Sequence, residues 1–185
     1  RARQLKETVS LLKQMWNSDD PVTMQGEFVN ATDLVTEPKP PRKVPILIGG
    51  TGKQVTLPLA AREASIWNNP AGSQSNLPEN INALHASMDK INRDHDDITI
   101  SQQCLIAIAP NEDEAGPMIE LAQKIFGGHM GDPTGPLAIT GSPNRIVDQI
   151  GKHIELGCTM FMIEFFGRDT REPAELFAKT VLPQF

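Results

Sequence analysis

The sequence predicts an α/β fold in which parallel strands alternate with helices. Four short apolar segments have the character of strands, and each is followed by a segment with helical spacing of its apolar residues. The first strand leads directly into a glycine-rich turn. Strands that alternate with helices form parallel βαβ units. Four such strands form either a small open sheet or half of a closed barrel, a fold of about 250 residues, and the pattern alone is consistent with both.

The N-terminal part of the sequence precedes these strands. Residues 3–16 are predicted to form a helix, because Leu5, Val9, Leu12 and Trp16 follow one another at spacings of four, three and four. A turn at 17–21 ends this helix, and residues 22–28 form a short extended segment around a glycine. The prolines of 37–43 require extended backbone, because proline fixes φ and restricts the residue before it.

The first two strands enclose a glycine-rich turn. Residues 44–48 are a continuous apolar run, which is typical of a parallel strand covered on both faces. The turn at 49–52 leads into a helix from about Lys53 to Ala64, in which Pro58 predicts a kink or a late start. A very short strand follows at 65–68.

The next helix, at about 77–93, has a clear start signal. Asn76 is a candidate N-cap, Pro78 lies in the first turn, and Glu79 completes a capping box. The apolar face of this helix is predicted to consist of Ile81, Leu84, Met88 and Ile91.

The C-terminal elements are predicted from similar signals. Asn111 with Glu114 caps a helix that runs to Phe126, and Ser142 caps a helix that starts at Pro143. The other predicted elements are a strand at 98–108, a Gly/Pro-rich loop at 127–141, a helix end at Gly157, a strand at 159–165 and a helix at 172–182.

Composition excludes several classes of function. The net charge of −6 argues against a nucleic-acid partner, because such proteins usually concentrate positive charge. No segment approaches the roughly 20 apolar residues of a membrane span, and no signal peptide is apparent. Cys104 and Cys158 predict neither a disulfide framework nor a zinc site. We therefore expect a cytoplasmic protein with no membrane partner and no metal.

The turn Gly49-Gly50-Thr51-Gly52 carries the clearest chemical signal. A strand that leads through glycines into a helix exposes unpaired backbone N–H groups near a partial positive charge, which favours a bound phosphate. Lys53 is a candidate additional charge. The turn is also consistent with a tight βα connection and no ligand. A P-loop is excluded, because Leu47 stands where that motif needs glycine and Gln54 where it needs serine or threonine.

Several segments occur in the same order as in one known family. They are the helix from Leu5 to Trp16, VTMQGEF (22–28), EPKPPRKVPILIGGTG (37–52), AREASIWN (61–68), GSPNRIVDQI (141–150) and ELFAKTVLP (175–183). On these segments the sequence resembles the luciferase-like monooxygenases, a family of flavin-dependent monooxygenases and deazaflavin-dependent oxidoreductases. The resemblance extends over essentially the whole chain and rests on several weak motifs that recur in order.

The resemblance implies a (β/α)8 TIM barrel, of which residues 1–185 would be a single partial domain. The four strands would be strands 5–8, the C-terminal half, and the first four strands would be absent, about 140 residues at the usual size of this fold. The sequence begins at Arg1 with a helical pattern already running and no capping residue before it. We therefore interpret the chain as a fragment.

The resemblance also implies a cofactor, FMN or a deazaflavin coenzyme of the F-420 type, whose phosphate the glycine-rich turn would hold. The candidate cofactor-binding residues are Ile48, Gly49, Gly50, Thr51, Gly52, Trp67 and Asn68. Trp67 equally fits a core tryptophan with a satisfied N–H. Catalytic residues remain unknown, because much of the substrate-facing surface would lie on the absent half.

The implied function is an oxidoreductase that transfers hydride to, or oxygenates, a small organic substrate. The alternative is a non-catalytic flavin-binding or structural half-barrel that associates with another chain. In both cases the expected partner is the missing N-terminal half or a second copy of the chain, because a half-barrel leaves open sheet edges and an uncovered apolar interior.

Other polar residues are candidates for a pocket. One of Gln102 and Gln103 must point to the barrel interior by strand alternation, in a pocket or a structural role. Glu164, in an apolar strand, is either a pocket carboxylate or the partner of Arg168 or Lys152. The loop at 127–141 is a candidate active-site lid with His129 as a ligand contact. The remaining histidines, His85, His95 and His153, are predicted to be solvated.

Overall fold

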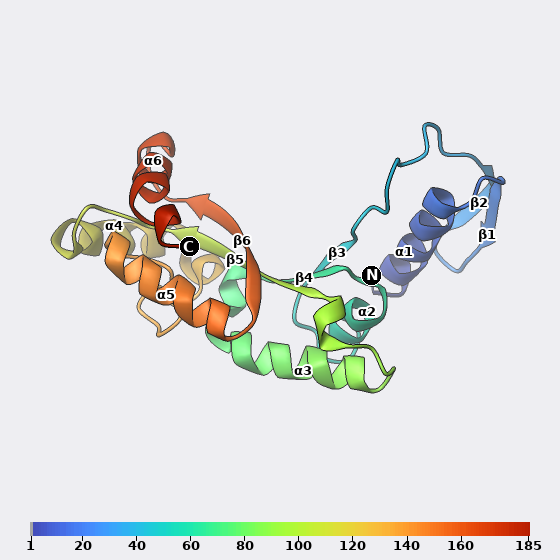
Figure 1. Cartoon of the computed structure of the whole chain (residues 1–185), viewed down its shortest axis with the longest axis horizontal. Coiled ribbons are helices and arrows are strands. Elements are labelled where there is room, and N and C mark those ends of the chain that lie inside the picture. Colours follow the sequence, from blue (N-terminus) through green and yellow to red (C-terminus); the bar gives the residue numbers. More distant parts are fainter. Residues whose placement is uncertain (1) are drawn as a thin grey trace.

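A four-stranded parallel sheet forms the centre of the molecule in the computed structural model, which describes residues 2–185 (Figure 1). Its strands are β3 (Leu47–Gly49), β4 (Ile66–Asn69), β5 (Thr99–Ile106) and β6 (Cys158–Phe165). The strands lie side by side in the order of the sequence, and each neighbouring pair is parallel. This confirms the predicted α/β fold with a parallel sheet.

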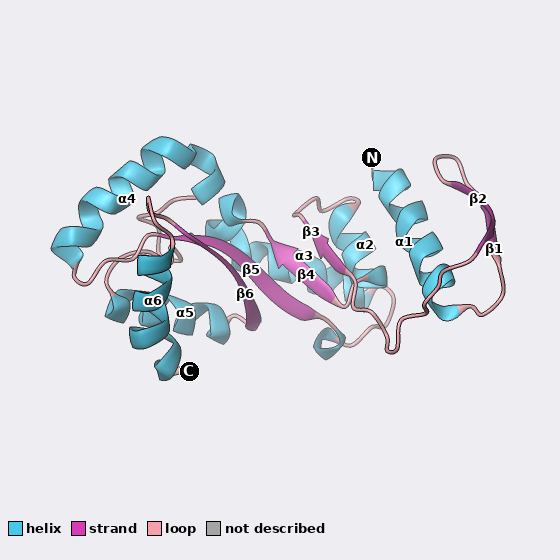
Figure 2. Cartoon of the chain, turned by 90° about the horizontal axis from the view of Figure 1, so that it is seen from above, coloured by secondary structure: helices cyan, strands magenta, loops and turns pink. Residues whose placement is uncertain are grey.

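Helices follow each strand and flank the sheet (Figure 2). The α-helices are α2 (Thr56–Glu63), α3 (Leu77–Asp89), α4 (Glu112–Phe126), α5 (Pro143–Glu155) and α6 (Arg171–Thr180). Short 3-10 helices are η1 (Ala71–Asn76), η2 (His95–Asp97), η3 (Gly127–Met130) and η4 (Leu182–Gln184). Helix α2 starts late, at Thr56, so that Pro58 lies in its first turn. Residues in the first turn donate no hydrogen bond within the helix, and proline is tolerated there although it has no N–H. Of the kink or late start that Pro58 predicted, the late start is confirmed.

One face of the sheet carries most of the core. Ile48, Trp67, Ile100 and Cys158 lie in register across the four strands and pack against apolar residues of α2 and α3. Further along the same face, Ile106 packs against α5 and α6. Four helices therefore cover this face, as the right-handed crossovers of a parallel sheet require.

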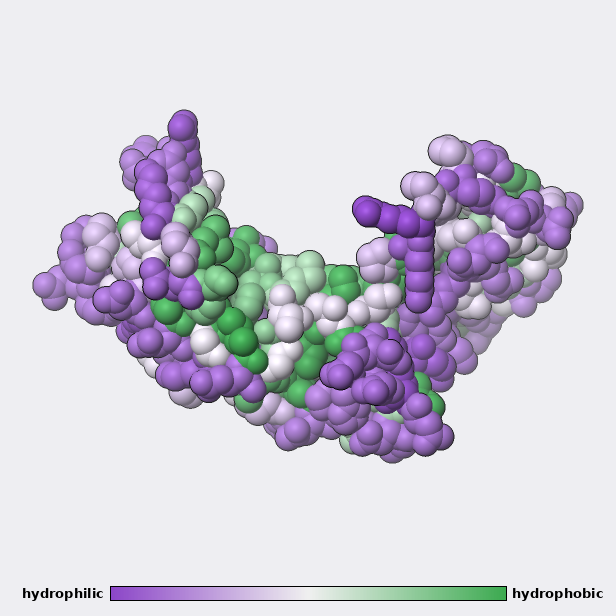
Figure 3. All heavy atoms as spheres, viewed as in Figure 1, coloured by the Kyte–Doolittle hydropathy of each residue, from purple (hydrophilic) through white to green (hydrophobic). Residues whose placement is uncertain are grey.

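The opposite face is only partly covered. Here α4 packs through Ala115 and Ile119 against Leu105 near the end of β5. At the other end of this face, Leu47 is 38% exposed. Figure 3 shows apolar residues gathered along the concave side of the molecule. The expectation that the first strand is covered on both faces is therefore wrong for the described chain.

The N-terminal segment comprises α1 (Ala2–Asn17) and an antiparallel pair, β1 (Val22–Gln25) and β2 (Asn30–Leu34). The sequence predicted α1 and the extended β1 but not β2. The turn between the two strands is held by Glu7, whose carboxylate accepts hydrogen bonds from the amides of Phe28 at 2.8 Å and Val29 at 3.0 Å. These bonds to the charged form lower the pKa of Glu7.

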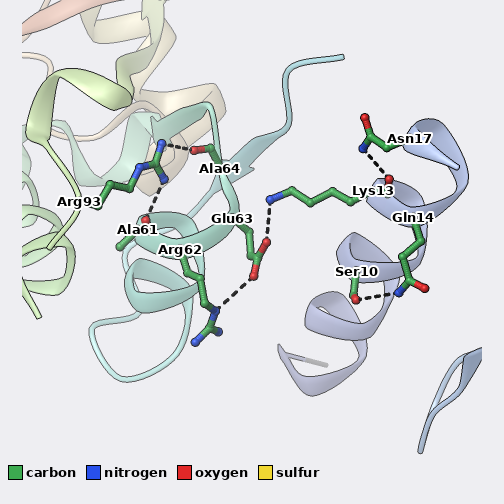
Figure 4. A network of polar contacts seen from close by, with 9 residues as sticks. All are labelled: Ser10, Lys13, Gln14, Asn17, Ala61, Arg62, Glu63, Ala64 and Arg93. Atoms are coloured by element: carbon green, nitrogen blue, oxygen red, sulfur yellow. Dashed lines mark hydrogen bonds and ion pairs between the residues drawn. The ribbon is translucent and has the colours of Figure 1, made fainter. Parts of the chain in front are cut away.

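Polar contacts attach α1 to the helix that follows β3 (Figure 4). Lys13 of α1 forms an ion pair with Glu63 at 2.7 Å, and Arg62 contacts the same carboxylate at 3.3 Å. Arg93 donates to the carbonyl oxygens of Ala61 and Ala64, both at 2.8 Å. A guanidinium thus satisfies carbonyls at the C-terminal end of α2, which the helix itself leaves without partners.

Some predicted boundaries and caps differ from the structure. The first strand begins at Leu47 rather than Val44, because Pro45 has no N–H to donate to a neighbouring strand. The side chain of Asn76 does not cap α3, and Glu79 pairs with Lys53 instead of completing a capping box. That helix ends at Asp89, so Ile91 lies beyond it and is 46% exposed.

Of the caps predicted for α4 and α5, the first is present and the second is not. Asn111 caps α4 as predicted, accepting the amide of Glu114 at 3.0 Å. The hydroxyl of Ser142 does not cap α5; its amide donates to the carboxylate of Glu112 at 2.8 Å. Gly157 ends α5 with φ +94°, as its residue type predicted.

His153 is fully buried, which corrects the expectation that it is solvated. Its Nδ1 lies 2.8 Å from the carbonyl oxygen of Gln149, and its Nε2 lies 3.4 Å from Nε2 of Gln74. Burial lowers the pKa of His153 from its ordinary 6.5, because a charged imidazole loses solvation there. The other two histidines lie nearer the surface, where the rings of His85 and His95 stack with centroids 3.9 Å apart.

This burial predicts a pH dependence of stability. Since the folded-state pKa of His153 lies below 6.5, the unfolded chain binds the proton more readily, and the free energy of unfolding falls as pH falls below 6.5. Above 6.5 the imidazole contributes no slope. We expect denaturant midpoints measured between pH 7.5 and pH 5.5 to fall less steeply for His153→Gln than for the unmodified protein.

The matched control is His85→Gln, because the pKa of the partly exposed His85 is also lowered by burial and by the neighbouring His95. This variant should reduce the change of the denaturant midpoint with pH by less than His153→Gln does. Identical slopes for the unmodified protein and His153→Gln would contradict the assignment.

Candidate functional site

The turn after β3 is fastened to β4 by two hydrogen bonds. The amide of Gly50 donates to the carbonyl oxygen of Asn68 at 3.1 Å, and Trp67 Nε1 donates to the carbonyl oxygen of Gly50 at 2.8 Å. Gly50 has φ +120°, a conformation that favours glycine. The chain therefore leaves the strand at a fixed angle and reaches the start of α2 in six residues.

The amides beyond Gly50 are available to a ligand. Within the described residues, neither backbone nor side-chain acceptors take a hydrogen bond from the amides of Thr51, Gly52, Lys53 and Gln54. Val55 precedes α2 and provides no side-chain cap. Unpaired N–H groups at a helix N-terminus carry a partial positive charge and bind anions.

The three glycines of the turn tolerate a side chain to different extents. A Cβ on Gly49 would meet only ordinary contacts, 3.8 Å from Asn68 Nδ2. A Cβ on Gly50 would lie 3.2 Å from the methyl group of Thr56 and also carries the strain of its positive φ. On Gly52 it would lie 2.9 Å from the hydroxyl of Thr56. A side chain at Gly49 would therefore fit in ordinary contact with Asn68, whereas one at Gly50 or Gly52 would crowd Thr56.

Asn68 is the predicted residue that best fits a ligand contact. Its side chain lies on the same face of the sheet as Gly49, and its Oδ1 accepts from the hydroxyl of Ser101 at 3.0 Å. Its Nδ2 donates to no acceptor in the described part of the chain. Sequence reasoning missed Ser101 and Thr56; strand alternation placed Ser101 on this face, but a lone serine gave no sign of its partner.

Two predicted contacts lie elsewhere. The side chains of Ile48 and Trp67 are buried in the core on the covered face, and Trp67 has no exposed surface. A fully buried indole whose N–H is satisfied agrees with the core tryptophan that the sequence left open as the alternative to a ligand contact. Trp67 instead donates a hydrogen bond to the turn from the core, and Lys53 forms an ion pair with Glu79.

A second group of polar residues lies in a cleft of about 410 Å³ at the ends of β5 and β6. Gln103, Glu164 and His129 all line it, together with Leu105 and Phe126. The structure thus brings together three residues that the sequence singled out separately. Gln103 Nε2 lies 3.4 Å from Glu164 Oε1.

The structure decides the alternatives that the sequence left open for these residues. Gln103 faces the cleft, whereas Gln102 is fully buried on the other face and contacts Asn69 at 2.8 Å. Among the described residues Glu164 forms no ion pair, so the expected pairing with Arg168 or Lys152 is wrong.

Two classes of site are not found in residues 2–185. No cluster of His, Cys, Asp and Glu side chains there has a geometry suited to a metal ion. In the same range, no helix combines the length and the apolar character that crossing a bilayer demands. Cys104 and Cys158 are buried free thiols, and burial raises the pKa of each to about 12. Neither is a nucleophile in this environment.

Among proteins of known function, the sequence is similar to an F420-dependent glucose-6-phosphate dehydrogenase from Microbacterium testaceum strain StLB037. The two are 23% identical in an alignment that covers all of this chain and 61% of the relative. A second F420-dependent glucose-6-phosphate dehydrogenase, from Kineococcus radiotolerans, is 39% identical over 30% of this chain and 16% of its own length.

Solved structures share the fold at low identity. The coenzyme F420 dependent tetrahydromethanopterin reductase from Methanopyrus kandleri superposes with a TM-score of 0.77 at 18% identity, covering all of this chain and 63% of its own. An EDTA monooxygenase from Chelativorans sp. BNC1 has a TM-score of 0.73 at 16% identity, covering all of this chain and 59% of its own.

These relatives are longer than the chain, which spans about 60% of the length of each full-coverage match. The family model described as luciferase-like monooxygenase matches residues 1–136, which is most of the sequence. The chain belongs to the luciferase-like monooxygenase family.

Proposed function

We propose that the chain is part of an oxidoreductase that binds FMN or a deazaflavin coenzyme of the F-420 type and acts on a small organic substrate. The proposal rests on one observation: at the start of α2, the amides of residues 51–54 have no acceptor within the part of the chain that the structure describes. The same class of cofactor is supported by the similar proteins, which include an F420-dependent dehydrogenase, an F420-dependent reductase and a monooxygenase.

We propose further that the four parallel strands are strands five to eight of a (β/α)8 barrel and that residues 1–185 are one partial domain. The unequal covering of the sheet supports this: four helices cover one face, whereas the opposite face is covered only by α4 near the end of β5, and the helices of a barrel form an outer ring. The glycine-rich turn lies at the carboxyl end of β3, where barrels place their ligand sites.

The residues present fit the anionic tail of such a cofactor. Amides of the turn would hold the phosphate, the Thr51 hydroxyl would donate an additional hydrogen bond, and Asn68 Nδ2 would face the ligand beside Gly49. The cofactor itself supplies hydride transfer or oxygen activation. The role of this chain is to hold and orient the cofactor; no proton-transferring residue is assigned to it.

The cofactor proposal can be tested by titrating the full-length protein with FMN and, separately, with coenzyme F420, following ligand fluorescence. We expect Thr51→Val to weaken binding about tenfold, because a hydrogen bond to a charged group contributes about 1.5–3 kcal/mol. Inorganic phosphate should compete with the cofactor in the unmodified protein. Thr51→Ser retains the hydroxyl and serves as the matched control.

Unchanged affinity for both cofactors in Thr51→Val, together with no competition by phosphate, would contradict the proposed site. Absence of any cofactor binding by the full-length protein would favour the structural form of the alternative, a non-catalytic half-barrel that binds no flavin and associates with another chain. The exposed Leu47 on the uncovered face of β3 is the observation that favours such an association.

A further inference from the structure

We infer that the cleft at the ends of β5 and β6 binds the polar head of a small non-anionic organic molecule, one with a hydroxyl or protonated amine that donates hydrogen bonds. The inference rests on the proposed function in one respect: identifying the bound molecule as the substrate assumes that the chain is part of an oxidoreductase. It concerns residues that are separate from the glycine-rich turn.

The size and walls of the cleft suit a small organic molecule. Its volume of about 410 Å³ is within the range of roughly 300–1,000 Å³ that is usual for ligand pockets. Leu105 and Phe126 provide apolar walls, and Pro70 contributes another from the segment after β4. Three elements of the fold therefore meet here, as at the mouth of a parallel sheet.

The polar groups of the cleft favour a hydrogen-bond donor. Glu164 is exposed and belongs to no ion pair among the described residues, and Gln103 contacts only one of its two oxygens, Oε1 at 3.4 Å. The other oxygen is free to accept. The described residues that line the cleft include neither lysine nor arginine.

This arrangement disfavours an anion. A carboxylate or phosphate head would face Glu164 without a cation to balance the two negative charges, whereas a hydroxyl or ammonium would complete the acceptors of Glu164. His129, on η3, also lines the cleft and provides a further polar group for the ligand. On the side of the cleft that this chain provides, these groups favour a neutral or cationic head over a phosphate ester, in contrast to the substrate in the names of the similar glucose-6-phosphate dehydrogenases.

The test uses three probes with the same apolar tail and different heads: hexylamine, hexan-1-ol and hexanoate. Binding to the full-length protein is followed by NMR through the ring-proton signal of His129, which is assigned by its loss in His129→Gln. We expect hexylamine and hexanol to shift this signal saturably, and hexanoate to bind at least about tenfold more weakly than hexylamine.

The variant Glu164→Gln should weaken hexylamine binding about tenfold, because the amide oxygen still accepts a hydrogen bond but no longer carries the negative charge that pairs with the ammonium. The ratio of hexylamine affinity to hexanoate affinity should fall accordingly. Glu155→Gln, an exposed substitution on α5 outside the cleft, is the matched control and should change neither. Circular dichroism checks that both variants are folded.

The inference is overturned if hexanoate binds as tightly as hexylamine, if none of the probes moves the His129 signal, or if Glu164→Gln leaves hexylamine affinity unchanged. FMN and F420 titrations on the same samples separate the two proposals. Retained alkylamine binding without cofactor binding would refute the proposed function alone, and the reverse result would refute only the cleft.

Discussion

Replacing Gly49 by valine is expected to weaken cofactor binding about 100-fold, or about 2.7 kcal/mol. The new side chain would occupy the open space beside Asn68 Nδ2, where the cofactor tail must pass to reach the free amides of the turn. A Cβ at this position meets only ordinary contacts, so we expect stability to change by less than about 1 kcal/mol. Fluorescence titration gives the affinity, and chemical denaturation gives the stability.

Two substitutions separate obstruction from loss of structure. Gly50→Ala should lower stability by about 1–3 kcal/mol, because its φ of +120° is strained for any residue with a side chain. Gly151→Val lies on α5 with no atom near its Cβ and should leave cofactor affinity unchanged. Full cofactor affinity in Gly49→Val would show that the ligand does not approach the turn past Gly49.

The order of the elements could be predicted from sequence because each was signalled locally. The amphipathic spacing of α1, the cap at Asn111 and the glycine at 157 each depend on neighbours in the chain. At two positions where a predicted cap interaction is missing, a distant residue forms a contact instead. Glu79 pairs with Lys53, and Glu112 takes the amide of Ser142. Sequence spacing cannot reveal such competition.

The site was predictable only in its backbone. The glycine pattern located the turn. An aromatic residue at a strand end, in contrast, is equally compatible with the core and with a ligand. Trp67 belongs to the core because the strand register places it beside Ile48 and Ile100. The cleft shows the converse. Gln103, His129 and Glu164 are far apart in the sequence. The parallel pairing of β5 with β6 brings Gln103 close to Glu164, and His129 of η3 lines the same cleft.

Truncation of Trp67 is expected to give the largest loss of stability in the chain. Trp67→Ala removes a fully buried indole between α2, α3 and the sheet, and such a substitution costs about 3–5 kcal/mol. Urea denaturation followed by far-UV circular dichroism measures the loss. A cost below about 1 kcal/mol would mean that Trp67 is not the centre of this core.

Trp67→Phe separates packing from the hydrogen bond to the glycine-rich turn. Phenylalanine keeps most of the buried ring but has no N–H to donate to Gly50, whose carbonyl oxygen lies 2.8 Å from Nε1. We expect a stability loss of about 1–2 kcal/mol from the lost bond and the smaller ring. Because that bond orients the residues whose amides would hold the phosphate, cofactor affinity should fall as well, although the side chain of residue 67 is buried in the core. If Trp67→Phe lowered stability but left affinity intact, the turn would be held by the Gly50–Asn68 bond alone.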